Sequence, residues 1–79
     1  MKILLPGGAG LVGQNLIVRL KDKGYKDIVV LDKHKANLAI LKKLHPQVKA
    51  IYADLAKFGD WQKYFIGADV VVMLQAQIG

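Results

Sequence analysis

The sequence predicts an α/β fold built on a parallel sheet, and three observations lead to it. Short apolar runs recur four times along the 79 residues, and each run is continuous, as in strands buried on both faces. Segments with apolar residues at helical spacing separate the runs. The connections are short, so the strands and helices form right-handed βαβ units. The predicted order is βαβαβαβ, with strand order 3-2-1-4 across the sheet.

The individual elements follow from the same periodicities. We predict, in order, strand 2–5, helix 11–23, strand 28–31, helix 35–44, strand 48–52, a short helix from about residue 60 to 65, and strand 70–74. Gly24 ends the first helix and His45-Pro46 ends the second. The apolar side chains expected to face the sheet are Val12, Leu16, Leu20, Leu38, Leu41, Leu44 and Trp61, with Phe65 or Tyr64.

The last strand is the most apolar of the four, although it would lie at an edge of the sheet. Strands of this kind normally have a further strand beside them, because an exposed apolar edge promotes aggregation. We therefore expect residues 1–79 to be the N-terminal part of a larger, here incomplete, domain.

The amino-acid composition argues against several classes of function. The net charge of +6 comes from lysines that are spread over the chain and are not clustered as on a nucleic-acid-binding surface. We therefore expect that the protein does not bind nucleic acid, although its positive charge attracts anionic ligands. No apolar run approaches the ~20 residues that span a bilayer, and the apolar start breaks at Pro6, unlike a signal peptide. There is no cysteine, and His34 and His45 have no second ligand at metal spacing. We expect a cytoplasmic protein that binds neither membrane nor metal.

A glycine-rich turn joins the first strand to the first helix. Gly8, Gly10 and Gly13 fit G-x-G-x-x-G, and Gly7 gives an overlapping G-x-x-G-x-x-G with the last two. Such glycines allow a positive φ, a close approach of backbone to a diphosphate, and close packing of helix on strand. The diphosphate of a dinucleotide would then lie on free N–H groups at the positive end of the helix dipole.

Asp32 ends the second strand, about twenty residues after Gly13, where a carboxylate can accept hydrogen bonds from an adenosine ribose. The alternative is an ordinary helix-capping or loop aspartate. A carboxylate here disfavours the 2′-phosphate of NADP by about 4 kcal/mol at ~4 Å and an effective dielectric constant of 20. Lys33, His34 and Lys35 would offset part of that repulsion. We expect NAD and leave NADP open.

Together, several segments resemble the extended short-chain dehydrogenase/reductase family, the NAD-dependent epimerase/dehydratase group, which has a Rossmann-type fold. The matching segments are Pro6–Gly13, Val30–Asp32, Ala53–Leu55 and Gly67–Gln77. The chain covers only the start of such a protein. The sequence departs from the family at Pro6, usually Thr, and at Met73 and Gln75, usually His and Ala.

The resemblance implies a role for each matching position. It makes Gly7, Gly10 and Gly13 the phosphate loop, with backbone N–H groups of Leu11 and Val12 on the diphosphate. It places Asp32 on the ribose. For the adenine and the rest of the cofactor it implies Asp54, Leu55, Leu74, Gln75 and Ala76. From its position alone, Asp54 would sooner be a loop carboxylate that caps local N–H groups.

The family's catalytic pair is a tyrosine with a lysine four residues later, and none of Tyr25, Tyr52 and Tyr64 has that partner. We therefore expect these residues to bind NAD without carrying the chemistry, so that the chain alone is inactive. The parent protein would be an epimerase/dehydratase-like oxidoreductase or isomerase acting on a nucleotide sugar, with a homodimer left open. The alternative is a non-enzymatic NAD(P) sensor with the same fold.

Overall fold

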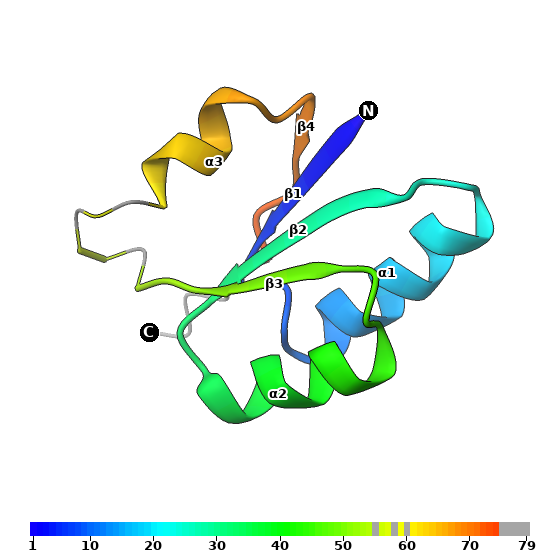
Figure 1. Cartoon of the computed structure of the whole chain (residues 1–79), viewed down its shortest axis with the longest axis horizontal. Coiled ribbons are helices and arrows are strands. Elements are labelled where there is room, and N and C mark those ends of the chain that lie inside the picture. The colour runs from blue at the N-terminus through cyan, green and yellow to red at the C-terminus, as the bar shows by residue number, and fades with distance from the viewer. Residues whose placement is uncertain (55, 58, 60, 75–79) are drawn as a thin grey trace.

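The computed structural model describes residues 1–54, 56, 57, 59 and 61–74. Within them the chain forms a parallel sheet of order β3-β2-β1-β4, which confirms the predicted topology (Figure 1). The elements are β1 (Lys2–Pro6), α1 (Leu11–Asp22), β2 (Asp27–Asp32), α2 (Lys35–Leu44), β3 (Lys49–Tyr52), α3 (Gln62–Ile66) and β4 (Val70–Val71).

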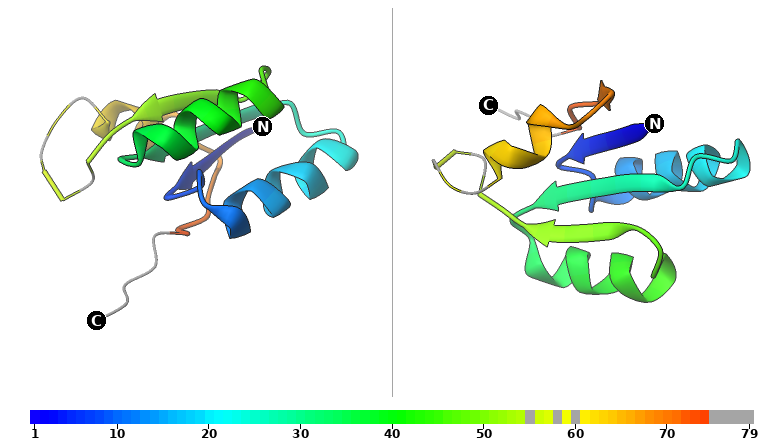
Figure 2. Two further views of the ribbon diagram at one scale, coloured as in Figure 1. Left: turned by 90° about the horizontal axis from the view of Figure 1, so that it is seen from below. Right: turned by 45° about the horizontal axis from the view of Figure 1, so that its top comes forward.

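Helices cover both faces of the sheet: α1 and α2 lie on one face and α3 lies on the other (Figure 2). Side chains of β1 and β2 alternate between two clusters. Ile3, Leu5, Ile28 and Val30 pack toward α1 and α2, whereas Leu4, Val29 and Leu31 pack toward α3. Burial on both faces explains why β1 and β2 are continuously apolar.

The predicted inward stripe of α1 is wrong at Val12, which is 68% exposed, while Ile17 is fully buried. Leu16 and Leu20 pack against the core as predicted. The difference arises at Gly13, which is buried against the loop before the helix. This contact turns Gly13 and Ile17, one helical turn apart, toward the sheet and leaves Val12 in solvent.

In α2 the predicted burial of Leu38 and Leu41 is confirmed, but that of Leu44 is wrong, because Leu44 is 59% exposed. The helix ends here, and the chain turns back through a hydrogen bond from the Val48 N–H to the His45 carbonyl, 3.0 Å long. Val48 is buried instead, because the turn places it on the face of the sheet that α1 and α2 cover.

Gly24 ends α1 as predicted. Its φ is +91°, and its N–H donates to the carbonyl of Lys21 at 3.0 Å. The N–H of Tyr25 donates to Leu20, also at 3.0 Å, which completes a Schellman motif. The sharp end of α1 allows β2 to begin three residues later, at Asp27.

Strand β4 is shorter than the predicted 70–74, but its backbone pairing with β1 continues beyond it. The N–H groups of Val72 and Leu74 donate to the carbonyls of Leu4 and Pro6, both at 2.9 Å. Helix α3 covers Gln62–Ile66 rather than 60–65, and Trp61, Tyr64 and Phe65 pack against the sheet as expected. Among the described residues, no helix is long and apolar enough to cross a bilayer.

Candidate functional site

The site lies where the parallel strands end, and its first component is the loop after β1. Gly7 has a φ of +78°, a conformation that favours glycine, and its N–H donates to the Leu31 carbonyl at 2.7 Å. The Gly8 N–H donates to the Leu5 carbonyl at 3.1 Å. A Cβ on Gly8 would meet Leu5 at 2.9 Å, so Gly8 is required for packing, a role that the motif alone did not assign.

Gly13 brings the start of α1 against this loop. A Cβ on Gly13 would collide with the carbonyl group of Gly8, so only glycine allows the two backbones to approach so closely. The side-chain amide of Gln14 adds a bond to the Ala9 carbonyl at 2.8 Å. Strand, loop and helix therefore form one rigid turn.

The N-terminus of α1 is open toward solvent. Gly10 is the N-cap residue and provides no side-chain cap, and the first turn contains no acidic residue. A Cβ on Gly10 would meet nothing within 4 Å, and the next two residues, Leu11 and Val12, are 77% and 68% exposed. The first N–H groups of a helix have no partner within it and carry the positive end of its dipole. The free N–H groups at the start of α1 therefore form a favourable binding position for an anion.

Asp32 is buried, with 7% of its surface exposed, and it faces the glycine loop. Its Oδ2 accepts a hydrogen bond from the Ala9 N–H at 3.1 Å. Its Oδ1 accepts from the His34 N–H at 3.0 Å and from His34 Nδ1 at 2.9 Å. Asp32 is not the cap of α2, because the N-cap residue there is His34. The carboxylate thus connects the end of β2 to the turn at the start of α1.

These contacts decide the charge of Asp32. Burial, the largest single influence, raises the pKa of the carboxyl group. The ring and backbone bonds from His34, the backbone bond from Ala9 and the charge of His34 together outweigh burial and hold the pKa below its ordinary value of 3.8. Asp32 is therefore an anionic acceptor at neutral pH.

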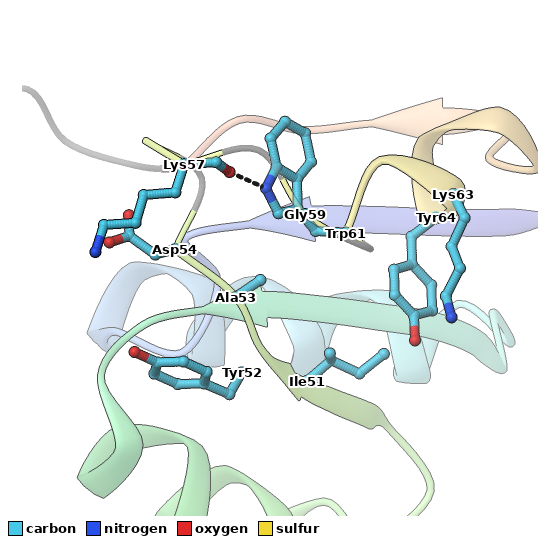
Figure 3. A pocket seen from close by; sticks show the side chains of 9 residues that line it. All are labelled: Ile51, Tyr52, Ala53, Asp54, Lys57, Gly59, Trp61, Lys63 and Tyr64. Atoms are coloured by element: carbon cyan, nitrogen blue, oxygen red, sulfur yellow. Dashed lines mark hydrogen bonds between the residues drawn. The ribbon is translucent and has the colours of Figure 1, made fainter.

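Asp54 follows β3, and the structure shows its carboxylate accepting the Ala56 N–H at 3.0 Å, the local capping contact that position alone suggested. It also lines a pocket of about 440 Å³ between β3 and α3, together with Ile51, Tyr52, Ala53, Lys57, Gly59, Trp61, Lys63 and Tyr64 (Figure 3). The β3 end is tied to β2 by the Ala53 N–H, which donates to the Asp32 carbonyl at 2.9 Å. Leu55, expected beside Asp54, lies outside the described residues.

Leu74 is half-buried beside the end of β1, through its bond to Pro6. The structure therefore brings the glycine loop, Asp32 and Leu74 together at the carboxyl ends of the strands. Asp54 follows the carboxyl end of β3, the strand beside β2. Gln75 and Ala76, the other two positions expected there, lie outside the described residues.

Lysine side chains lie over the rings of two of the tyrosines. Lys35 Nζ lies 5.1 Å from the ring centre of Tyr52, and Lys63 Nζ lies 5.3 Å from that of Tyr64. Both are contacts over the ring face, the geometry of cation–π attraction. The residues present can bind and orient a ligand.

Fold and site together define the class of protein: a Rossmann-type α/β fold with a glycine loop, an open helix N-terminus and an acidic strand end. Residues 3–79 match the model of the NAD dependent epimerase/dehydratase family. The chain belongs to this family.

Individual relatives agree with this assignment. The chain is 38% identical over 60 residues to a UDP-glucose 4-epimerase of Streptococcus mutans, a match that covers 71% of this chain and 16% of that protein. It is similar in structure to the UDP-glucuronic acid 4-epimerase of Bacillus cereus, solved with NAD and also with UDP-glucuronic acid and NAD. The TM-score is 0.74 at 30% identity, and the likeness covers all of this chain and 27–28% of the other. The chain thus spans a minor part of the relatives it matches.

Proposed function

We propose that this chain holds the adenosine diphosphate end of NAD in an epimerase/dehydratase that acts on a nucleotide sugar. The observation that carries the proposal is the bond between Asp32 and the Ala9 N–H, because it places a buried anionic acceptor beside the open N-terminus of α1. The diphosphate and the ribose of one adenosine group need those two features next to each other.

Each described residue of the site then has a part. The backbone N–H groups of Leu11 and Val12 would bind the diphosphate, and the missing side chain of Gly10 would leave it room. Asp32 would accept the ribose hydroxyls. Asp54 and Leu74 would border the adenine and the remainder of the cofactor. NAD supplies a hydride acceptor, and these residues only bind and orient it.

The substrate and the reaction are inferred from the relatives, two of which are UDP-sugar 4-epimerases by name. In this proposal residues 1–79 are the N-terminal part of a dinucleotide-binding domain, and the catalytic tyrosine and lysine come from sequence after residue 79. The named relatives are epimerases, so the alternative of a non-enzymatic sensor gains no support from them.

Binding of ADP-ribose to the purified protein tests the proposal, because this probe contains the diphosphate and the ribose but lacks nicotinamide. We expect saturable binding by isothermal titration calorimetry, competition by NAD, and little binding of adenosine, which lacks the anion for α1. Binding of adenosine as tight as that of ADP-ribose, or no binding of either, would count against the proposal.

A further inference from the structure

Asp32 has almost no acceptor capacity left for a ligand. An ionised carboxylate offers about four acceptor positions, two on each oxygen. His34 fills both positions on Oδ1, with its backbone N–H at 3.0 Å and its ring Nδ1 at 2.9 Å, and Ala9 fills one position on Oδ2. Since a carboxylate only accepts, Nδ1 must carry the proton in the ring contact.

A ribose presents two adjacent hydroxyl groups, and a carboxylate that binds both needs one free position on each oxygen. The two backbone bonds to Asp32 are fixed by the glycine loop and by the turn into α2. The His34 side chain is 65% exposed, so its ring can rotate into water at little cost. Of these three contacts, the ring contact is therefore the one that can break.

We propose that the His34 ring competes with the adenosine ribose for Oδ1 of Asp32, so that binding of the adenosine group releases the ring. The inference rests on the proposed function and adds to it a residue that limits the affinity for the adenosine group. The sequence offered one signal for this contact, an acceptor and a donor side chain two residues apart.

The test compares wild-type protein, His34→Ala and the matched control His45→Gln, a histidine change at the opposite end of α2. We expect His34→Ala to bind ADP-ribose about 3- to 10-fold more tightly at pH 7.5, since it loses one competing hydrogen bond and keeps the backbone bond. The affinity of His45→Gln for ADP-ribose should equal that of the wild type.

A second probe separates competition for the acceptor from simple loss of bulk. The nucleotide 2′,3′-dideoxy-ADP lacks both hydroxyls, so its affinity should be the same for the wild type and His34→Ala. Weaker or equal ADP-ribose binding by His34→Ala, or an equal gain with the dideoxy probe, would each overturn the inference and leave the proposed function standing. No binding of ADP-ribose by any of the three proteins would overturn both.

Discussion

Substitution of Gly13 by alanine is expected to lower the free energy of unfolding by about 2–3 kcal/mol and to abolish measurable NAD binding. The added Cβ would collide with the backbone of Gly8, which no side-chain rotation relieves, so helix and loop must separate. The diphosphate site is formed by that contact and should be lost with it. Urea unfolding, monitored by circular dichroism, measures the change in stability. Calorimetric titration with NAD measures the loss of binding.

The matched control is Gly10→Ala in the same loop. The backbone of Gly10 has a φ of −76°, which alanine adopts freely, and its Cβ would meet no atom within 4 Å. The free energy of unfolding of Gly10→Ala should stay within about 0.5 kcal/mol of the wild-type value. NAD binding should weaken, because the methyl group enters the space assigned to the diphosphate. Equal stability of the two variants would show that the contact between Gly13 and Gly8 does not hold the turn.

The second large effect is expected at Asp32. Replacement by asparagine should lower NAD affinity about 10- to 100-fold, because a charge-assisted acceptor for the ribose is lost. NADP should lose less affinity than NAD, or gain some, since the carboxylate no longer repels a 2′-phosphate. Titration of both cofactors measures the ratio of their affinities. The charge-matched control is Asp22→Asn, an exposed change at the end of α1 that should leave that ratio unchanged.

The same substitution has a consequence for acid stability. The pKa of Asp32 is lowered in the folded state, so the unfolded chain takes up the proton first. The stabilisation by the ionised group is therefore complete above the ordinary pKa of 3.8 and is lost as the pH falls below it. We expect the wild type to lose more stability than Asp32→Asn between about pH 5 and pH 3. An equal loss would mean that the bonds to Asp32 do not stabilise the fold.

Much of the fold was predictable because local patterns and tertiary structure agree. Continuous apolar runs identified the strands, of which β1 and β2 are buried on both faces, and Gly24 identified the end of α1. The errors at Val12 and Leu44 have a common cause. The rotation of a helix and the point where the chain leaves it are set by tertiary contacts, here Gly13 on Gly8 and the return of Val48 under the sheet.

The candidate site was predictable where a residue belongs to a sequence motif. It was not predictable where the site depends on contacts between residues far apart in the chain. Glycine spacing identified the loop, and strand position identified Asp32. No sequence signal joins Ala9 to Asp32, because the bond spans 23 residues and its donor is a backbone N–H that any residue but proline provides. Gly8 was visible in the motif, but its packing role depends on how closely Leu5 and Val30 approach it.

A crystal structure of the protein with bound NAD would locate the adenosine diphosphate relative to the glycine loop and Asp32. We expect diphosphate oxygens about 2.7–3.2 Å from the backbone nitrogens of Leu11 and Val12, and the adenosine ribose on Asp32 with the His34 ring displaced. A diphosphate bound away from the glycine loop, or an adenosine group that leaves Asp32 without a ribose contact, would contradict the proposed binding of NAD.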